Sequence, residues 1–290
     1  CDVFCSFCVI PYTRGRQRSR TLADCVRETA ALTARGHREI VVTGVNIGTY
    51  MEGGADFAGL LDQLSEVHGV GRLRISSIEP MTVDDSVIDL MARNDRICPY
   101  LHLCLQSGDD AILETMKRPY TAAEYRSLLL DIVARVPNAG IGTDIIVGFP
   151  GETEESFAKT YALLEELPFY HFHVFSYSEH THTRSAKMPE KIQPEIVKKR
   201  SEKVRRLGQI KKQRFHEAQV GRTLQVLFER RDPRGRLVGH AENYALVSVD
   251  DPRDLTNRIV PVEVREADVD EVRGTVLAGV ELDRQDRVTA

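Results

Sequence analysis

The chain has 290 residues, of which 42% are hydrophobic and 28% are charged, and its formal net charge is −4. This apolar fraction supports a folded core and excludes general disorder. No run of about 18 apolar residues is present to span a membrane. The mildly acidic net charge, taken for the whole chain, argues against a nucleic-acid partner. The length accommodates one large domain or two ordinary ones.

The first eight residues hold three of the six cysteines: Cys1, Cys5 and Cys8. Thiolates this close together in one loop converge on a metal ion or an iron–sulfur cluster. Structural zinc takes four ligands, and no further His or Cys follows at finger spacing. A four-iron cluster held by three cysteines instead leaves one iron free to bind a substrate or cofactor. The pattern favours such a cluster, and a structural metal site is the alternative.

The other three cysteines, Cys25, Cys98 and Cys104, are scattered, and we expect them to be small buried hydrophobic side chains. A disulfide scaffold would be shorter and denser in cysteine, so we expect a reduced protein of the cytoplasm. No signal peptide is visible. Because the first residue already belongs to a motif, we expect the chain to be part of a longer one.

Between residues 20 and 180 the pattern alternates between helices and apolar strands. The predicted helices span residues 21–35, 57–67, 83–93, 121–136 and 153–167. The predicted strands span residues 39–46, 73–79, 101–106, 141–147 and 172–177. This alternation predicts an α/β fold with a parallel sheet and outer helices. Right-handed crossovers would curl it into a partial barrel of about six units, fewer than the eight of a complete barrel.

Polar residues follow several of these strands, and sites in such barrels lie at the C-terminal strand ends. The segments concerned are residues 43–46, 76–79, 106–108, 148–151 and 176–178. Each also has an ordinary explanation, since a strand-to-helix turn needs glycine and a loop carboxylate can simply be solvated. They are therefore candidate contacts for a substrate or cofactor.

Residues 190–218 are predicted to form a strongly basic helix. Residues 191–214 contain ten Lys or Arg against two Glu, a net charge of +8, so the rest of the chain sums to −12. A charge run usually marks a solvated face, but this imbalance favours contact with an RNA backbone. A second basic segment, residues 14–20, either contacts a phosphate or the carboxylate of a cofactor or is a solvated loop. The candidate RNA-binding residues are Arg14, Arg16, Lys198, Lys199 and Arg206.

After residue 221 the chain is predicted to be all β. The expected strands span residues 224–229, 237–241, 244–249, 259–264 and 273–277. Five short strands at this spacing suggest a small barrel of the oligonucleotide-binding type. We therefore predict one domain over residues 1–218, including the basic helix, a second over residues 219–282, and a polar tail over residues 283–290.

Four histidines, His171, His173, His180 and His182, look like metal ligands at first sight. The first two alternate along a predicted strand. No group of carboxylates accompanies the four histidines in the sequence, so no metal site is predicted there.

The spacing Cys-x-x-x-Cys-x-x-Cys, with Phe7 before the last cysteine and a parallel half-barrel after it, resembles the radical S-adenosylmethionine (SAM) superfamily. By that resemblance, Cys1, Cys5 and Cys8 hold a [4Fe-4S] cluster whose open iron chelates the amino and carboxylate groups of SAM. One electron then cleaves SAM to a 5′-deoxyadenosyl radical, while the protein positions the cofactor. The implied cofactor-binding residues are Phe7, Thr43, Gly44, Asn46, Glu79, Gln106, Ser107, Asp144, Gly148 and Phe149.

More of the chain is similar to the methylthiotransferase branch of that superfamily. The matching stretches are residues 8–15, 19–20, 105–108, 120–121 and 146–153, and residues 239–244 look like part of the RNA-binding TRAM domain. Residues 43–50 and 74–80 look most like the enzymes that add a methylthio group at C2 of N6-threonylcarbamoyladenosine beside the tRNA anticodon. Asn46 and Cys104 depart from that pattern, in which His and Pro are common.

The alternatives to this substrate are isopentenyladenosine in tRNA and a ribosomal protein, and a non-catalytic RNA-binding protein is a third reading. The resemblance implies tRNA as a partner, an electron donor such as flavodoxin or ferredoxin, and no membrane. It also implies a second [4Fe-4S] cluster, held by an N-terminal domain that this sequence does not include. We therefore expect this chain to hold one cluster and to cleave SAM, but not to complete thiolation.

Overall fold

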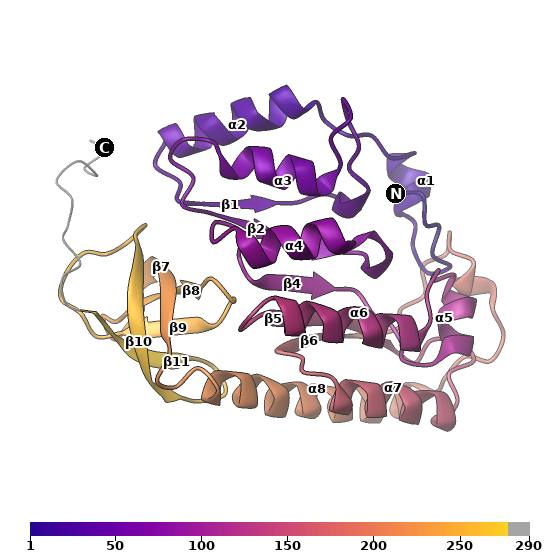
Figure 1. Cartoon of the computed structure of the whole chain (residues 1–290). Coiled ribbons are helices and arrows are strands. Elements are labelled where there is room, and N and C mark those ends of the chain that lie inside the picture. Colours follow the sequence, from indigo (N-terminus) through magenta and orange to yellow (C-terminus); the bar gives the residue numbers. More distant parts are fainter. Residues whose placement is uncertain (278–290) are drawn as a thin grey trace.

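The computed structural model describes residues 1–277 and has an arc of parallel strands at its centre (Figure 1). The strands are β1 (Glu39–Val42), β2 (Arg72–Ile75), β3 (Ser77–Ile78), β4 (Tyr100–Leu103), β5 (Gly140–Val147) and β6 (His171–Ser176). β1 pairs with β2, and β3 to β6 form a four-stranded sheet in sequence order. Only Ser76 separates β2 from β3, so the two sheets continue one another. The predicted partial barrel is confirmed.

Helices connect the strands and cover the outer face of the arc (Figure 1). They are α2 (Leu22–Ala34), α3 (Phe57–Ser65), α4 (Asp85–Arg93), α6 (Ala122–Arg135) and α7 (Glu154–Glu166). Side-chain oxygens cap the first turn of each, and Thr121 and Glu124 form the reciprocal capping box of α6. The structure also contains two short helices that were not predicted from the sequence, α1 (Ile10–Arg14) and α5 (Asp110–Met116).

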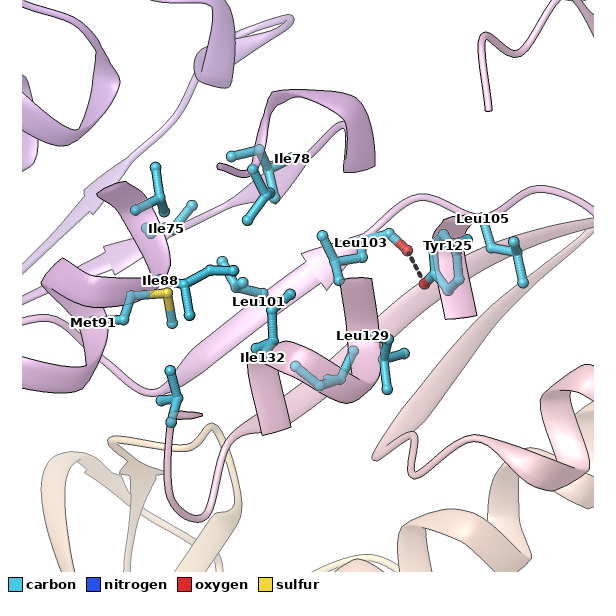
Figure 2. Close-up of a cluster of buried hydrophobic side chains, with 14 of the residues drawn as sticks. Ile75, Ile78, Ile88, Met91, Leu101, Leu103, Leu105, Tyr125, Leu129 and Ile132 are labelled. Atoms are coloured by element: carbon cyan, nitrogen blue, oxygen red, sulfur yellow. Dashed lines mark hydrogen bonds between the residues drawn. The ribbon is translucent and has the colours of Figure 1, made fainter. Parts of the chain in front are cut away.

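Apolar side chains from β4 and the neighbouring helices form the core that positions the strand ends (Figure 2). Leu101 and Leu103 of β4 are fully buried, as are Leu129 and Ile132 of α6. The buried Tyr125 hydroxyl donates a hydrogen bond to the Leu103 carbonyl at 3.0 Å. This bond ties α6 to the end of β4, where the polar segment 106–108 begins.

A long helix, α8 (Pro194–Glu217), leads into a second, closed barrel (Figure 1). The barrel strands are β7 (Thr223–Arg231), β8 (Leu237–Ala241), β9 (Leu246–Val249), β10 (Ile259–Ala267) and β11 (Val272–Val276). Their order is β10-β11-β9-β8-β7, around a hydrophobic core of their own. The predicted five-stranded barrel is confirmed. Residues 278–282 of the predicted domain and the predicted tail, residues 283–290, lie outside the described residues.

Two arginines of β2 join the two barrels. Arg72 and Arg74 are both 3% exposed and both hydrogen-bond to the Glu39 carboxylate on β1. Arg72 also donates to the carbonyls of Gln225 and His240, at 2.6 and 3.0 Å. Backbone oxygens of the second barrel are thus bound by buried guanidinium groups of the first.

No helix within residues 1–277 is both long enough and apolar enough to cross a bilayer.

Candidate functional site

The three-cysteine loop lies at the end of the arc to which the strands point, next to α5 (Figure 1). Ser6, which is 2% exposed, holds this loop in place. Its backbone N–H donates to the Met116 carbonyl and its hydroxyl to the Thr115 carbonyl, both at 2.9 Å. The Ser6 carbonyl accepts from the Ser185 N–H at 3.0 Å. Two segments distant in sequence, residues 115–116 and Ser185, therefore fix the loop at the C-terminal strand ends.

Cys1, Cys5 and Cys8 are half-buried free thiols. Among residues 1–277, the groups whose ligand atoms all lie within 4.8 Å of one another do not include these three. Ligands of a single ion would have to meet that closely. The thiolates of an iron–sulfur cube bind separate irons, so they stand farther apart. The three loop thiols are therefore not gathered as the ligands of a single ion would be.

Arg118 connects this loop to Glu79, although no sequence motif marks it as a site residue. Its Nη1 donates to the Cys5 Sγ and to the Glu79 Oε1, each at 3.2 Å. The side chain is 1% exposed, and its Nε donates to the Tyr120 hydroxyl at 2.9 Å. Burial raises the pKa of the Cys5 thiol, and the Arg118 guanidinium opposes that rise. Glu79 is thus an ion-pair partner of Arg118 and not a freely solvated carboxylate.

A cavity of about 1090 Å³ opens beside the loop and is lined by Cys1, by residues 13–20 and by residues 40–47, among others. Thr43, Gly44 and Asn46, which were predicted from the sequence to bind a cofactor, lie on its wall. The Asn46 Oδ1 and the Tyr50 hydroxyl, both on this wall, are buried without a hydrogen-bond partner. Two orphaned polar atoms suit a polar ligand, because leaving them unpaired costs about 1–3 kcal/mol each.

Arg14 and Arg16 line the same cavity and are exposed. Arg16 is 3.6 Å from the Asp2 carboxylate and lies over the Phe4 ring, 5.3 Å from its centroid. The side chains of Arg14 and Arg16 are therefore accessible both from the solvent and from the cavity.

Four further residues predicted to bind a cofactor, Phe7, Phe149, Gln106 and Ser107, do not line this cavity. Phe7 and Phe149 pack edge to face with ring centroids 6.5 Å apart, behind the cysteine loop. Gln106 has a positive φ of 72°, and its backbone bridges to β5. The Ser107 hydroxyl instead faces α7, 3.2 Å from the Thr160 hydroxyl, and is 3% exposed. The structure therefore does not bring the Ser107 side chain into the cavity.

Gly148 has a packing role that can be measured. Its φ is +80°, and a Cβ there would lie 2.4 Å from the Val197 Cγ2 of α8. We expect Gly148→Ala to lower the free energy of unfolding by about 1–3 kcal/mol, measured by urea denaturation. Gly235→Ala is the matched control, because Gly235 has a φ of +84° and nothing within 4 Å of its added Cβ. Equal losses in the two variants would contradict a role for the Val197 contact.

The basic helix α8 uses some of its charges internally. Arg200 is 7% exposed and donates to Glu152, and the Lys211 ammonium donates to the Leu167 carbonyl at 2.7 Å. Lys198, Lys199 and Arg206 are exposed, and within residues 1–277 no hydrogen bond or ion pair engages their side chains. These three remain available to an external anion.

Asp144 does not face the large cavity but lies among histidines in the interior of the first barrel. Its Oδ1 is 2.8 Å from the His102 Nε2 and 3.2 Å from the His173 Nδ1. Burial alone would raise the pKa of Asp144, but these hydrogen bonds hold it well below its usual range. Burial lowers the pKa of the neighbouring His171 to about 3. The sequence predicted no group of carboxylates and no metal site at these histidines. The structure places one carboxylate, that of Asp144, beside His173 and His102, although these residues are distant in sequence.

Comparison with known proteins identifies the family. The chain matches the model of the radical SAM superfamily over residues 1–164 and that of the TRAM domain over residues 217–277. The chain therefore belongs to the radical SAM superfamily and carries a TRAM domain. A [4Fe-4S] cluster and SAM, the two expected cofactors, are those of this superfamily.

The relatives are tRNA methylthiotransferases, as the motifs predicted. The tRNA-2-methylthio-N(6)-dimethylallyladenosine synthase of Alkaliphilus oremlandii is 34% identical over 96% of this chain and 60% of its own length. The threonylcarbamoyladenosine tRNA methylthiotransferase MtaB of Bacillus subtilis is 35% identical over 92% of this chain and 61% of its own length. The chain thus spans about three fifths of the curated relatives it matches.

A solved structure supports the fold. The radical SAM methyltransferase TsrM from Kitasatospora setae superposes with a TM-score of 0.55 and 21% identity, covering 64% of this chain and 37% of that one. At this identity the likeness concerns the fold alone.

Proposed function

We propose that this chain is the SAM-cleaving and RNA-binding part of a methylthiotransferase acting at C2 of N6-threonylcarbamoyladenosine in tRNA. The observation that carries the proposal is the half-buried three-cysteine loop, which lies beside a cavity with two orphaned polar atoms and is linked through Arg118 to Glu79. In this proposal Cys1, Cys5 and Cys8 hold the cluster. The cluster and SAM together supply a radical able to remove hydrogen from an unactivated C–H bond.

The chain's own residues position and enclose that chemistry. Asn46 and Tyr50 offer polar atoms to the amino-acid or ribose part of SAM, and Arg118 sets the charge beside Cys5. Phe7 and Phe149 pack behind the loop and exclude water from its inner side. In this proposal the domains keep the expected bounds, residues 1–218 and 219–282.

Relatives of both kinds match this chain at similar identity, 34% for the dimethylallyladenosine synthase and 35% for the threonylcarbamoyladenosine enzyme. The isopentenyl-type substrate is therefore the second candidate. Residues 43–50 and 74–80 favour the threonylcarbamoyl substrate by their resemblance to that branch. Nucleoside mass spectrometry of tRNA from a strain lacking the gene that encodes this chain distinguishes the two.

Loss of the methylthio group from threonylcarbamoyladenosine alone is the expected result of that deletion. Loss from isopentenyladenosine alone would transfer the assignment to the second candidate. If both modified nucleosides persist unchanged, the target is not tRNA, and the ribosomal-protein alternative is next to be tested.

The free face of α8 provides a test of RNA binding. We expect reversal of Lys198, Lys199 and Arg206 to Glu to weaken tRNA binding and to flatten its salt dependence. Each lost phosphate contact should lower the slope of log K against log salt by about one. Fluorescence anisotropy with labelled tRNA at several salt concentrations measures this slope.

Arginines on the outer helices of the first barrel provide the matched control. Reversal of Arg35, Arg93 and Arg126 changes the net charge by the same amount on other surfaces. We expect this variant to keep the slope of the unaltered chain. Equal slopes for the α8 variant and the unaltered chain would show that α8 does not face the RNA.

A further inference from the structure

Three histidines in the interior of the first barrel have no role in the proposed function. His102 comes from β4, and His171 and His173 come from β6. Their ring centroids are 4.7 to 5.6 Å apart. One ligand nitrogen from each lies within 4.8 Å of the other two. Imidazoles that meet this closely can share one ion, since zinc binds histidine nitrogen at about 2.0–2.1 Å.

The backbone beside them leaves room for the rings. Gly142 of β5 faces the group, and a Cβ there would lie 2.7 Å from the His102 Nδ1 and 2.6 Å from the His171 Cε1. The same Cβ would be 3.1 Å from the His171 Nε2. The two ring nitrogens therefore border one small space, which any side chain larger than glycine would fill.

Asp144, two residues farther along β5, orients two of the rings. Its carboxylate binds the Nε2 of His102 and the Nδ1 of His173, at 2.8 and 3.2 Å. The other nitrogens of these two rings, His102 Nδ1 and His173 Nε2, have no hydrogen-bond partner within residues 1–277. A carboxylate bound to the far nitrogen of a metal-ligating histidine fixes its tautomer and makes the ligand more basic.

The group opens toward a second cavity, of about 430 Å³, between the two barrels. Tyr100 and Arg74 of the first barrel line it, together with His240 and Tyr244 of the second. The side chain of His173 is 56% exposed on this side. An ion bound by the three histidines would thus have an approach for a fourth ligand from solvent.

We propose that His102, His171 and His173 bind one divalent transition-metal ion of the zinc type, with Asp144 as the carboxylate that orients His102 and His173. Three imidazoles select zinc and its neighbours over magnesium and calcium, which prefer oxygen ligands. The site uses none of the loop cysteines, so it stands independently of the proposed function.

The test measures zinc and iron together in the whole chain. The protein is reconstituted with its cluster under anaerobic conditions, mixed with one equivalent of Zn²⁺ and desalted, and both metals are then quantified by mass spectrometry. We expect about one zinc with about four irons per chain. In the His171→Ala/His173→Ala variant we expect zinc to fall at least about tenfold while iron is unchanged.

The iron content reports whether the variant still folds and holds its cluster. A second variant, Asp144→Asn, keeps the shape of the side chain, and we expect it to weaken zinc binding by about 10–100-fold. The matched control is His180→Ala/His182→Ala, which removes two exposed histidines whose ring centroids are 5.8 Å apart. This control should retain zinc at the level of the unaltered chain.

Cobalt gives a second readout that does not depend on iron. With Cys1, Cys5 and Cys8 changed to Ser, added Co²⁺ should give the visible bands of four-coordinate cobalt, and His173→Gln should remove them. Zinc below about one tenth of an equivalent in the unaltered chain would overturn the proposal. So would full zinc retention in the His171→Ala/His173→Ala variant, which would locate the ion elsewhere.

Discussion

Replacing Cys5 with Ser is expected to reduce bound iron from about four atoms per chain to near zero. SAM cleavage, measured as 5′-deoxyadenosine formed with dithionite, should fall to background. The reason is that Cys5 is one of only three thiols in the loop, so the cluster has no spare protein ligand. Cys1→Ser and Cys8→Ser should behave in the same way.

The scattered cysteines supply the control for this result. Cys98 is 1% exposed, and burial raises the pKa of its thiol to about 11, so it is a poor metal ligand at neutral pH. Cys98→Ala should retain both iron and SAM cleavage. About eight irons in the unaltered chain would contradict the expectation of a single cluster, and full iron in Cys5→Ser would remove Cys5 from the ligand set.

Glu39→Ala is expected to lower the free energy of unfolding by about 3–5 kcal/mol, because it leaves two buried guanidinium groups without their carboxylate. Glu39 accepts from the Arg72 Nε at 2.5 Å and from the Arg74 Nε at 2.8 Å. Urea denaturation measures the loss. We also expect faster proteolysis between α8 and β7, because the same arginines bind the second barrel.

Acid pH should reduce the difference in the free energy of unfolding between the unaltered chain and Glu39→Ala. Burial by itself would raise the pKa of Glu39, but Arg74 and Arg72 lower it below its usual value in the folded chain. A carboxylate with a lowered pKa stabilises the fold at neutral pH, and this contribution is lost as the pH falls through that lowered pKa. The gap between the unaltered chain and Glu39→Ala should therefore narrow under acid conditions.

The exposed ion pair between Glu28 and Arg20 provides the control for Glu39→Ala. Glu28 pairs with Arg20, and its side chain is 53% exposed, against 14% for Glu39. Glu28→Ala should cost no more than about 1 kcal/mol. Similar losses for both variants would show that the Glu39 pair does not carry the contact between the barrels.

The sequence predicted those features that depend on local pattern. Apolar strands and capping residues such as Thr121 located the elements to within a few residues, and the loop cysteines marked the candidate site. Short elements escaped, because α1 and α5 have too few residues to show a helical period. Ser107 was a reasonable candidate by position, yet only the packing of α7 shows that its hydroxyl bonds to Thr160.

Contacts between distant residues could not be predicted in this way. Arg118 is 113 residues from Cys5, and only the fold brings the two together. His102 and His173 likewise meet Asp144 across 42 and 29 residues. Charge counting also overstated the free surface of α8, because Arg200 and Lys211 use their charges to hold the helix against α7.

The length of helix α8 sets the distance between the two barrels. Its 24 residues give a length of about 36 Å, and it packs along β6 and α7 before it contacts β10. A Cβ at Gly208 would lie 3.1 Å from the Phe172 ring, so the helix sits close to the sheet along its middle. The arginines of β2 also bind the second barrel, so the two barrels are connected through both α8 and β2. If RNA binds as proposed, movement of one barrel toward the other would break these buried hydrogen bonds, so we expect the RNA to bend instead.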